Sequence, residues 1–260
     1  MNILYIGDIV GKSGKLALET SLKKLRSQFD IDLCIGNGEN ASGGFGITPE
    51  VADELFELGI DIITSGNHIY DKKEIISFLD YNSKILRPAN YPAEAPGKGS
   101  CFIKASNGKI VGVLNLIGRV FMDPADCPFK KADVEILKLK EKTSIIFVDI
   151  HAEVTSEKSA LGWYLDGRAS AVIGSHTHVQ TADERILPNG TAFLSDAGMT
   201  GAKDSVIGIK TENAISKFIS KLPRRFETAT GKTQLRGVVI NVDQQTGKAK
   251  RIERIQLDVQ

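Results

Sequence analysis

Cysteine is scarce in this sequence, and the few cysteines do not pair by spacing. The 260 residues include three cysteines, Cys34, Cys101 and Cys127, and no C-x-x-C motif joins two of them. An odd number of scattered cysteines is typical of reduced thiols and argues against a disulfide framework. We therefore expect a cytoplasmic protein whose fold needs no disulfide.

Long hydrophobic runs and a strong charge of either sign are also absent. No apolar run approaches the roughly 18–20 residues that a helix needs to cross a bilayer. The opening stretch "MNILYIGDIV" has no basic leader, so it predicts a first strand instead of a signal peptide. The formal net charge is +1, and the basic runs "KLKEK" and "LPRRF" are short. We expect no membrane span and no dedicated nucleic-acid surface.

Short apolar runs alternate with helical patterns along the first third of the chain. We expect strands at 2–8, 31–40 and 60–68, and helices at 14–29, 48–59 and 71–80. In the second helix, Thr48 is a suitable N-cap and Pro49 suits the first helical position. Three strand–helix units in succession favour an α/β fold whose strands are buried on both faces.

From about residue 100 the pattern indicates a second sheet. Strands are expected at 101–106 and 109–116, joined by an "NGK" hairpin turn, and at 144–151 and 170–176, joined by a helix-like stretch at 157–165. The last part, 235–257, predicts two strands around a turn. No linker, repeat or low-complexity tract interrupts the chain. We predict one α/β domain over residues 1–260, built around two sheets with helices outside.

Polar side chains follow five of the predicted strands. These residues are Asp8, Glu39, Asn40, Asn67, His68, His151, His176 and His178. They include all four histidines of the chain. In open α/β sheets, ligands bind at the carboxyl ends of strands, where loops carry functional side chains. A single histidine at a strand end would indicate a hydrogen-bonded structural residue, but four of them with two carboxylates favour one functional site.

The mixture of imidazole, carboxylate and carboxamide groups indicates which ions such a site would hold. These ligands suit Fe, Mn or Zn and disfavour a soft thiolate site. One ion needs only three or four protein ligands, and the chain offers more. We therefore expect two ions bridged by Glu39, an arrangement typical of phosphoester hydrolysis. In a turn, the rings of His176 and His178 can both point toward neighbouring ions.

The order of these motifs resembles that of the calcineurin-like metallophosphoesterases. The chain presents "GD" at 7–8, "GEN" at 38–40, "GNH" at 66–68, "DIHAE" at 149–153 and "SHTH" at 175–178. More closely, "GDIVGK", "NGENASGG", "HAEVTSEK" and "GWYLDGRASAVIGSHTHVQTAD" look like the bacterial YmdB-type phosphodiesterase subfamily, over essentially the whole chain. The resemblance implies a four-layer α/β/β/α sandwich of two mixed sheets flanked by helices.

The resemblance also implies a role for each site residue. Metal one would be bound by Asp8, Glu39, Asn40 and His178, and metal two by Glu39, Asn67, His151 and His176. His68 would not bind metal and would act as general acid, a role that suits a group titrating near neutral pH. Two positions depart from the wider superfamily. Val10 stands where an Asp-x-His motif has its histidine, and Glu39 replaces the usual bridging aspartate.

We predict a dinuclear-metal phosphodiesterase that hydrolyses cyclic nucleotides or similar small phosphodiesters. The resemblance implies 2′,3′-cyclic and also 3′,5′-cyclic nucleotides as substrates, two Fe or Mn ions with Zn as the alternative, and self-association into a homo-oligomer. Two other functions stay open. One is a phosphomonoesterase or nuclease on the same site, and the other is a regulatory protein that binds metal and nucleotide with incidental turnover.

Four further stretches allow a structural and a functional interpretation. The stretch "GDIVGKS" lacks P-loop spacing, so we expect a helix N-terminus beside Asp8. The glycine-rich "NASGGFGIT" either shapes the site or forms a plain turn. Residues 118–133 are predicted as a long irregular connection, either a lid, an oligomer contact or a surface loop. Trp163 and Tyr164 are expected in the core or in an interface.

Overall fold

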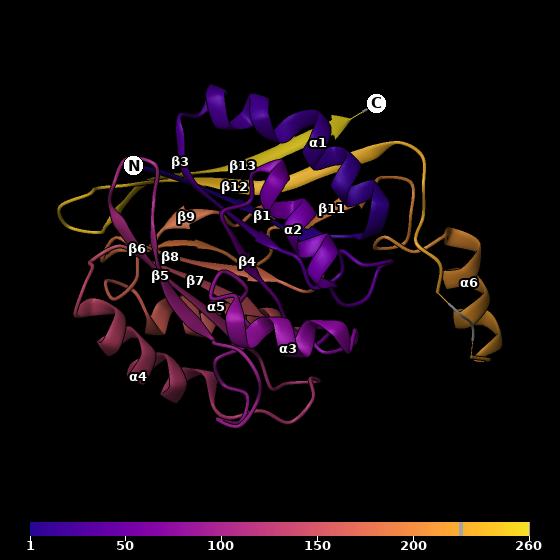
Figure 1. Ribbon diagram of the computed structural model, residues 1–260, viewed down its shortest axis with the longest axis horizontal. Coiled ribbons are helices and arrows are strands. Elements are labelled where there is room, and N and C mark those ends of the chain that lie inside the picture. Colours follow the sequence, from indigo (N-terminus) through magenta and orange to yellow (C-terminus); the bar gives the residue numbers. More distant parts are fainter. Residues whose placement is uncertain (224–225, 260) are drawn as a thin grey trace.

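Two β-sheets pack face to face in the computed structural model, which describes residues 1–223 and 226–259 (Figure 1). The first sheet has the order β2-β11-β12-β1-β3-β4, with β13 paired to β12. Its strands are β1 (Asn2–Ile6), β2 (Asp8–Ile9), β3 (Ile31–Asn37), β4 (Ile62–Thr64), β11 (Met199–Ala202), β12 (Thr233–Val242) and β13 (Ala249–Val259). Because β1, β3 and β4 are parallel and β12 is antiparallel to β1, this sheet is mixed.

The second sheet has the order β5-β6-β7-β8-β10-β9. Its strands are β5 (Ser100–Lys104), β6 (Ile110–Ile117), β7 (Ile146–His151), β8 (Ala171–Ser175), β9 (Arg185–Ile186) and β10 (Ala192–Leu194). The four central strands are parallel, and the edge strands β5 and β9 are antiparallel to their neighbours. The predicted hairpin is confirmed as β5–β6, and Gly108 in its turn takes the left-handed conformation at φ 83°.

Helices cover the outer face of each sheet. On the first sheet lie α1 (Gly11–Gln28), α2 (Pro49–Leu58) and α3 (Glu74–Tyr81), and on the second lie α4 (Pro128–Lys140) and α5 (Thr155–Tyr164). Leu18, Leu55 and Ile75 of the first set are buried in one core with Leu4 of β1. A separate core holds α4 and α5 against the second sheet. The predicted four-layer α/β/β/α arrangement is confirmed.

A third core fills the space between the two sheets. Tyr5 of β1 and Phe147 of β7 are fully buried there, with ring centroids 5.2 Å apart. Burial of two such rings removes several hundred Å² of apolar surface from water, on the order of 2–3 kcal/mol of favourable free energy for each side chain. This core therefore fixes the strand ends of one sheet relative to those of the other.

The predicted start of α2 illustrates how local sequence sets an element. The side chain of Thr48 accepts a hydrogen bond from the backbone N–H of Val51, at 3.4 Å, and Pro49 occupies the first turn. Gly59 ends the helix in the left-handed conformation at φ 108°, which glycine adopts without steric cost. The N-cap and the proline position are both as predicted.

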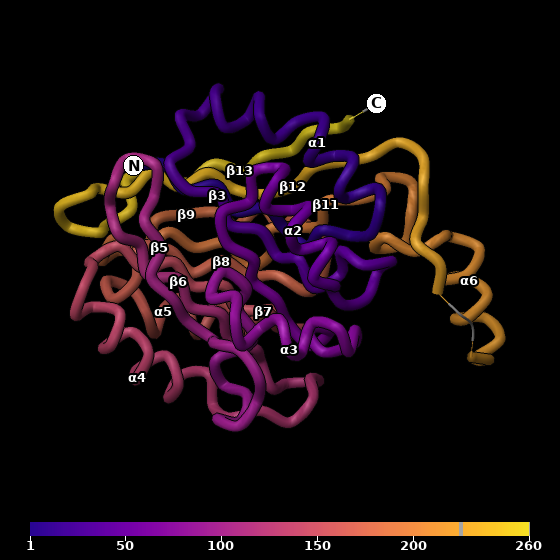
Figure 2. Tube along the Cα trace, in the orientation of Figure 1, coloured from indigo at the N-terminus to yellow at the C-terminus, as the bar shows by residue number. Residues whose placement is uncertain are grey.

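Several sequence-based expectations are corrected by the structure. The stretch 118–133 is not irregular throughout, because α4 begins at Pro128. A further helix, α6 (Thr211–Ser220), was not predicted from the sequence. It stands away from the sandwich (Figure 2). Trp163 and Tyr164 are 52% and 40% exposed, which excludes the core and leaves the interface as the remaining part of that prediction. Within the basic run "LPRRF", residues 224–225 lie outside the described residues. No helix among the described residues is long and apolar enough to cross a membrane.

Candidate metal centre and active site

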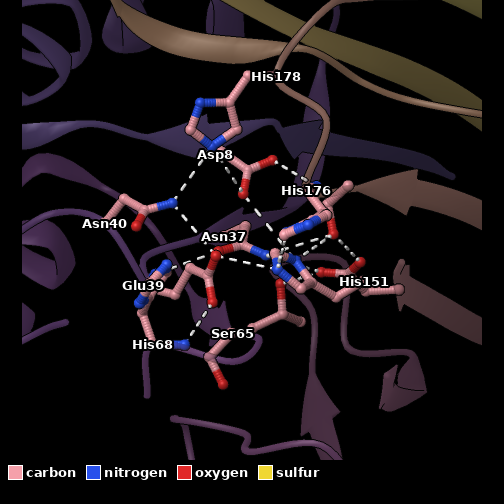
Figure 3. Close-up of polar contacts among 12 residues, drawn as sticks. Asp8, Asn37, Glu39, Asn40, Ser65, His68, His151, His176 and His178 are labelled. Atoms are coloured by element: carbon pink, nitrogen blue, oxygen red, sulfur yellow. Dashed lines mark hydrogen bonds and ion pairs between the residues drawn. The ribbon is translucent and has the colours of Figure 1, made fainter. Parts of the chain in front are cut away.

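The polar side chains at the strand ends meet where the carboxyl ends of strands from both sheets come together (Figure 3). On the first sheet, β1, β3 and β4 run parallel in register, so the residues that follow them emerge at one edge. On the second sheet, His151 of β7 pairs with Ser175 of β8. His151 Nε2 lies 3.0 Å from Oε1 of Glu39, and this contact joins the two edges.

One group of donors surrounds His151. Its Nε2 lies 3.1 Å from Oδ1 of Asn67 and 3.0 Å from Nδ1 of His176. One ligand atom each from Glu39, His151 and His176 lies within 4.8 Å of the others. Two imidazole nitrogens, a carboxylate oxygen and an amide oxygen therefore converge on one point, a donor set suited to Mn, Fe or Zn. These are the four residues expected around metal two.

A second group lies on the other side of Glu39. His178 Nε2 is 3.7 Å from Oδ1 of Asp8 and 3.3 Å from Nδ2 of Asn40, and that amide lies 3.2 Å from Oε1 of Glu39. A half-turn of the Asn40 amide exchanges its nitrogen for its oxygen, the atom that binds a metal. Asp8 is fully buried, and its Oδ1 has no hydrogen-bond donor among the described residues. A buried carboxylate oxygen without a donor is costly, and a cation at this point would satisfy it.

A bend after β8 lets His176 and His178 face the same cluster. Both residues take positive φ values, 94° and 65°, which are uncommon for residues other than glycine. Thr177 between them is held by Asp196, which accepts hydrogen bonds from its backbone N–H at 3.1 Å and its hydroxyl at 2.6 Å. Asp196 also forms a buried ion pair with Lys158 at 2.8 Å. The strained bend is therefore fixed by buried polar contacts, and the turn geometry predicted for this motif is observed.

A buried network behind His151 was not predicted from the sequence. Nδ1 of His151 lies 2.9 Å from the Ser175 hydroxyl, which donates to Oδ1 of Asp149 at 2.7 Å. The other oxygen of Asp149 accepts from Tyr5 at 2.7 Å and from Thr64 at 2.5 Å. One signal was available, because Asp149 precedes His151 by two residues on the same strand and therefore points to the same face.

Burial and neighbouring charges shift the pKa values of Glu39 and His151 in opposite directions. Burial raises the pKa of Glu39, but the positive charge of His151 outweighs this effect and lowers the pKa to about 2. Burial lowers the pKa of His151, and the Glu39 and Asp8 carboxylates reverse this effect and raise the pKa to about 9. Burial together with the charge of His151 lowers the pKa of His176 to about 3. At neutral pH, Glu39 and His151 are thus an ion pair and His176 is neutral, the form that binds metal.

His68 lies beside the two groups of donors and makes a different set of contacts. Its backbone N–H donates to Oε2 of Glu39 at 3.1 Å, whereas its ring Nδ1 lies 2.8 Å from Oδ2 of Asp71. His176 also has an acidic neighbour, because Oε2 of Glu153 lies 3.1 Å from its Nε2. Sequence reasoning missed Asp71 and Glu153, although each stands within three residues of a site residue in the motifs "GNHIYD" and "DIHAE".

A cavity of about 150 Å³ opens onto the cluster, lined by Glu39, Asn40, His68, His176, His178, Val10, Gly44, Phe45, Ile207, Ile209 and Phe226. Gly44 and Phe45 belong to the glycine-rich loop, so this loop does shape the site. The helix N-terminus expected near Asp8 is observed, because α1 begins at Gly11 directly after β2. Arg168, which follows the predicted helix-like stretch 157–165, does not line this cavity. Its guanidinium forms an ion pair with Asp133 at 2.6 Å.

Comparison with known proteins places this chain in a family. The chain is 52% identical to the 2′,3′-cyclic-nucleotide 2′-phosphodiesterase of Bacillus subtilis, over 98% of this chain and 96% of that protein. A hypothetical protein from Thermus thermophilus superposes with a TM-score of 0.94 at 38% identity, covering 100% of both chains. A structure described as a novel phosphatase, from Mycoplasma pneumoniae, gives 0.93 at 33% identity, covering 99% of this chain and 93% of that one.

These similarities extend over nearly the whole length of the protein, as does the match to a family model. That model, described as YmdB-like protein, matches residues 4–255. The recognition of this subfamily from its motifs is therefore confirmed: the chain belongs to the YmdB-like protein family.

Proposed function

We propose that this protein is a dinuclear-metal-dependent phosphodiesterase that hydrolyses small phosphodiesters, with 2′,3′-cyclic nucleotides as its main substrates. The observation that carries the proposal is the arrangement of two donor groups on either side of Glu39, which is buried and shared by both. The activity named for the Bacillus relative supports the substrate class. Hydrolysis of 3′,5′-cyclic nucleotides is a wider part of the same proposal.

The donors divide between the two ions as their contacts suggest. Asp8, Glu39, Asn40 and His178 would hold one ion, and Glu39, Asn67, His151 and His176 the other. When bound, a pair of such ions supplies Lewis-acid polarisation of the phosphoester and of the attacking water. The nitrogen and oxygen donors suit Fe or Mn, with Zn as the alternative.

His68 would act on the leaving group. Because its Nδ1 faces Asp71 at 2.8 Å, Nε2 is the ring atom left to meet substrate. In the protonated ring, Nε2–H donates its proton to the departing alkoxide oxygen as the P–O bond breaks, and the Asp71 carboxylate stabilises the charged form. Asp71 would thus be a positioning residue for the general acid.

A substrate panel combined with metal analysis tests this proposal. Protein purified without added metal is assayed before and after Mn or Fe supply, on 2′,3′-cyclic AMP, 3′,5′-cyclic AMP, p-nitrophenyl phosphate and RNA. We expect two metal ions per chain and the highest kcat/KM on the 2′,3′-cyclic nucleotide. Preference for the monoester or RNA would indicate a phosphatase or nuclease, and tight nucleotide binding without turnover would indicate a regulatory binding protein.

The remaining expectations concern organisation, and we propose a single cytoplasmic domain that forms a homo-oligomer. Self-association is supported by α6, which exposes Ile215, Phe218 and Ile219 to 53%, 75% and 80%. An apolar face of this kind on a helix that stands away from the body is typical of an interaction surface. Light scattering on the purified protein would give the oligomeric state.

A further inference from the structure

The cavity at the metal centre has two chemically different sides. One side consists of the site residues Glu39, Asn40, His68, His176 and His178. The rest of the lining is apolar and includes the side chains of Phe45, Ile207 and Phe226. Phosphoryl hydrolysis needs only the polar side, so the apolar side calls for a separate explanation.

Two aromatic rings, Phe45 and Phe226, belong to this apolar lining. The centroid of Phe45 lies 5.1 Å from that of the His68 ring, in an edge-to-face arrangement at 70°. Phe226 lies nearly parallel to Phe45, with centroids 6.4 Å apart and an interplanar angle of 22°. Lys217 of α6 places its ammonium 4.1 Å from the Phe226 centroid and so holds that ring by a cation–π contact. The aromatic surface therefore begins directly beside the proposed general acid.

The glycine-rich loop holds Phe45 in a fixed place. Gly43, Gly44 and Gly46 have φ values of 68°, 97° and 74°, and the loop is closed by a bond from the Ser42 N–H to the Gly46 carbonyl at 3.0 Å. A Cβ on Gly44 would lie 2.6 Å from Cγ2 of Thr228. Only glycine fits these positions without strain, and Phe45 is the one large side chain between the Ser42 and Gly46 groups that close the loop.

Ile207, at the mouth of the cavity, has a backbone conformation that isoleucine rarely adopts. It occupies the first central position of a tight turn in which Val206 and Ile209 exchange backbone hydrogen bonds of 2.9 and 3.0 Å. Both central residues have positive φ, 47° for Ile207 and 98° for Gly208, so the turn is of type I′, where asparagine, aspartate or glycine is favoured. A β-branched residue there is strained, and yet its side chain is 50% exposed.

The backbone of this turn has a clear role, because the Ile207 carbonyl accepts a hydrogen bond from Nδ1 of His178 at 2.9 Å. Asparagine would supply the same carbonyl with less strain. What isoleucine adds is an apolar surface at the cavity mouth. Local violations of this kind are expected where a side chain serves a ligand.

We propose that Phe45, Ile207 and Phe226 form a base subsite, which binds the nucleobase of a nucleotide whose phosphate lies at the metal centre. This inference rests on the proposed function and deepens it. A nucleobase is flat and has a π-face that stacks on aromatic side chains. None of the three side chains carries a hydrogen-bonding group, so the subsite accepts every base and favours purines through their larger stacked area.

Equilibrium binding tests the subsite without requiring turnover. Isothermal titration of the metal-loaded protein compares adenosine 3′-phosphate with methyl riboside 3-phosphate, which lacks only the base. In the wild type, we expect the nucleotide to bind more tightly. Phe45→Ala and Phe226→Ala should each reduce the ratio of the two affinities by roughly five- to 100-fold, the range for loss of one stacked base. Ile207→Asn should reduce it about threefold while keeping both metal ions and the melting temperature.

Phe102→Ala is the matched control, because Phe102 lies on β5, outside the residues that line the cavity. It should leave the ratio of affinities at the wild-type value. The subsite is ruled out if Phe45→Ala and Phe226→Ala leave this ratio unchanged, or if both ligands weaken equally. Failure of the proposed function gives a different result: metal-loaded wild type would not hydrolyse 2′,3′-cyclic AMP, whereas the base-dependent affinity and its loss in the variants would still be measured.

Discussion

The hydroxyl of Ser175 lies 2.9 Å from Nδ1 of His151 and donates a hydrogen bond to the buried carboxylate of Asp149 at 2.7 Å. Because the Ser175 hydroxyl donates to Asp149, its oxygen can accept a hydrogen bond from Nδ1–H of His151. Nε2 then faces Glu39 and Asn67. Histidine ligands commonly have such a partner on their second nitrogen, which fixes the ring orientation and the tautomer. Ser175 is thus a positioning residue for His151, a ligand of metal two in the proposed set.

Replacing Ser175 by alanine should weaken metal binding. The change removes the nearest partner of Nδ1 in a fully buried imidazole, and losses of this kind reduce metal affinity by about 10- to 100-fold. Chelator competition followed by metal analysis of the protein would measure the effect. Ser106→Ala, at an exposed position in the β5–β6 turn, is the control and should retain wild-type affinity. Unchanged affinity in Ser175→Ala would contradict the positioning role.

Replacing His178 by alanine should remove one metal ion and leave the other. Val10 stands where the wider superfamily has a histidine, so His178 is the one imidazole available to metal one in the proposed ligand set. His176→Ala should instead affect metal two, which retains His151. Metal stoichiometry of the two purified variants would test this, and two tightly bound ions in His178→Ala would refute the assignment.

The site could be predicted from the sequence because its residues follow strands. Apolar periodicity located the ends of β1, β3, β4, β7 and β8, and parallel strands bring such ends to one edge. Asp149 was missed for a physical reason. It lies within the apolar run of β7, and nothing in that run shows that Tyr5, Thr64 and Ser175 supply its hydrogen bonds from three other segments.

Other features depend on tertiary contacts that no local pattern encodes. Phe45 and Phe226 are far apart in the sequence, and only the fold places their rings 6.4 Å apart. Trp163 was expected in the core or in an interface, and the structure places it on the surface, where the Arg185 guanidinium lies 5.3 Å from its ring centroid. α4 was missed because its charged residues obscured the positions of Ala132, Ile136 and Leu139, which are its buried face.

The loss of kcat caused by replacing His68 should depend on the leaving group. An alkoxide needs a proton as it departs, whereas p-nitrophenolate is a stable anion and does not. His68→Ala should therefore lower kcat on 2′,3′-cyclic AMP by about 10²- to 10³-fold, with a much smaller loss on bis-p-nitrophenyl phosphate and full metal content. Asp71→Asn should show the same pattern at about tenfold. Equal losses on both substrates would show that His68 does not act as general acid.

Metal binding near neutral pH should release about one proton from His151. Its pKa of about 9 keeps the ring protonated at pH 7.5 in the metal-free protein, whereas a metal ligand must be neutral. Titration calorimetry in two buffers that differ in ionisation enthalpy gives the number of protons released. We expect the apparent metal affinity to rise from pH 6.5 to 9 and then level off. Absence of proton release at pH 7.5 would show that His151 is not protonated in the metal-free protein and would contradict its raised pKa.

The same ionisation predicts how the stability of the metal-free protein changes with pH. Because the folded pKa of His151, about 9, exceeds the unfolded value near 6.5, its stabilisation is complete below pH 6.5 and is lost as the pH rises through 9. The loss is on the order of 3 kcal/mol at most. Glu39, with a pKa of about 2, titrates below this window. His176, with a pKa of about 3, stays neutral in the folded protein, and its unfolded form loses its proton near pH 6.5, at the lower edge of the window.

Chemical denaturation of metal-free protein at pH 6.5, 7.5 and 9 would measure this loss. The gap between the free energies of unfolding of metal-loaded and metal-free protein should widen over the same range, because metal affinity rises while the ion pair weakens. Glu39→Gln is the matched variant: it removes the largest of the negative charges that raise the pKa of His151, so the slope in the metal-free protein should become smaller. An unchanged slope in Glu39→Gln would place its origin in another group.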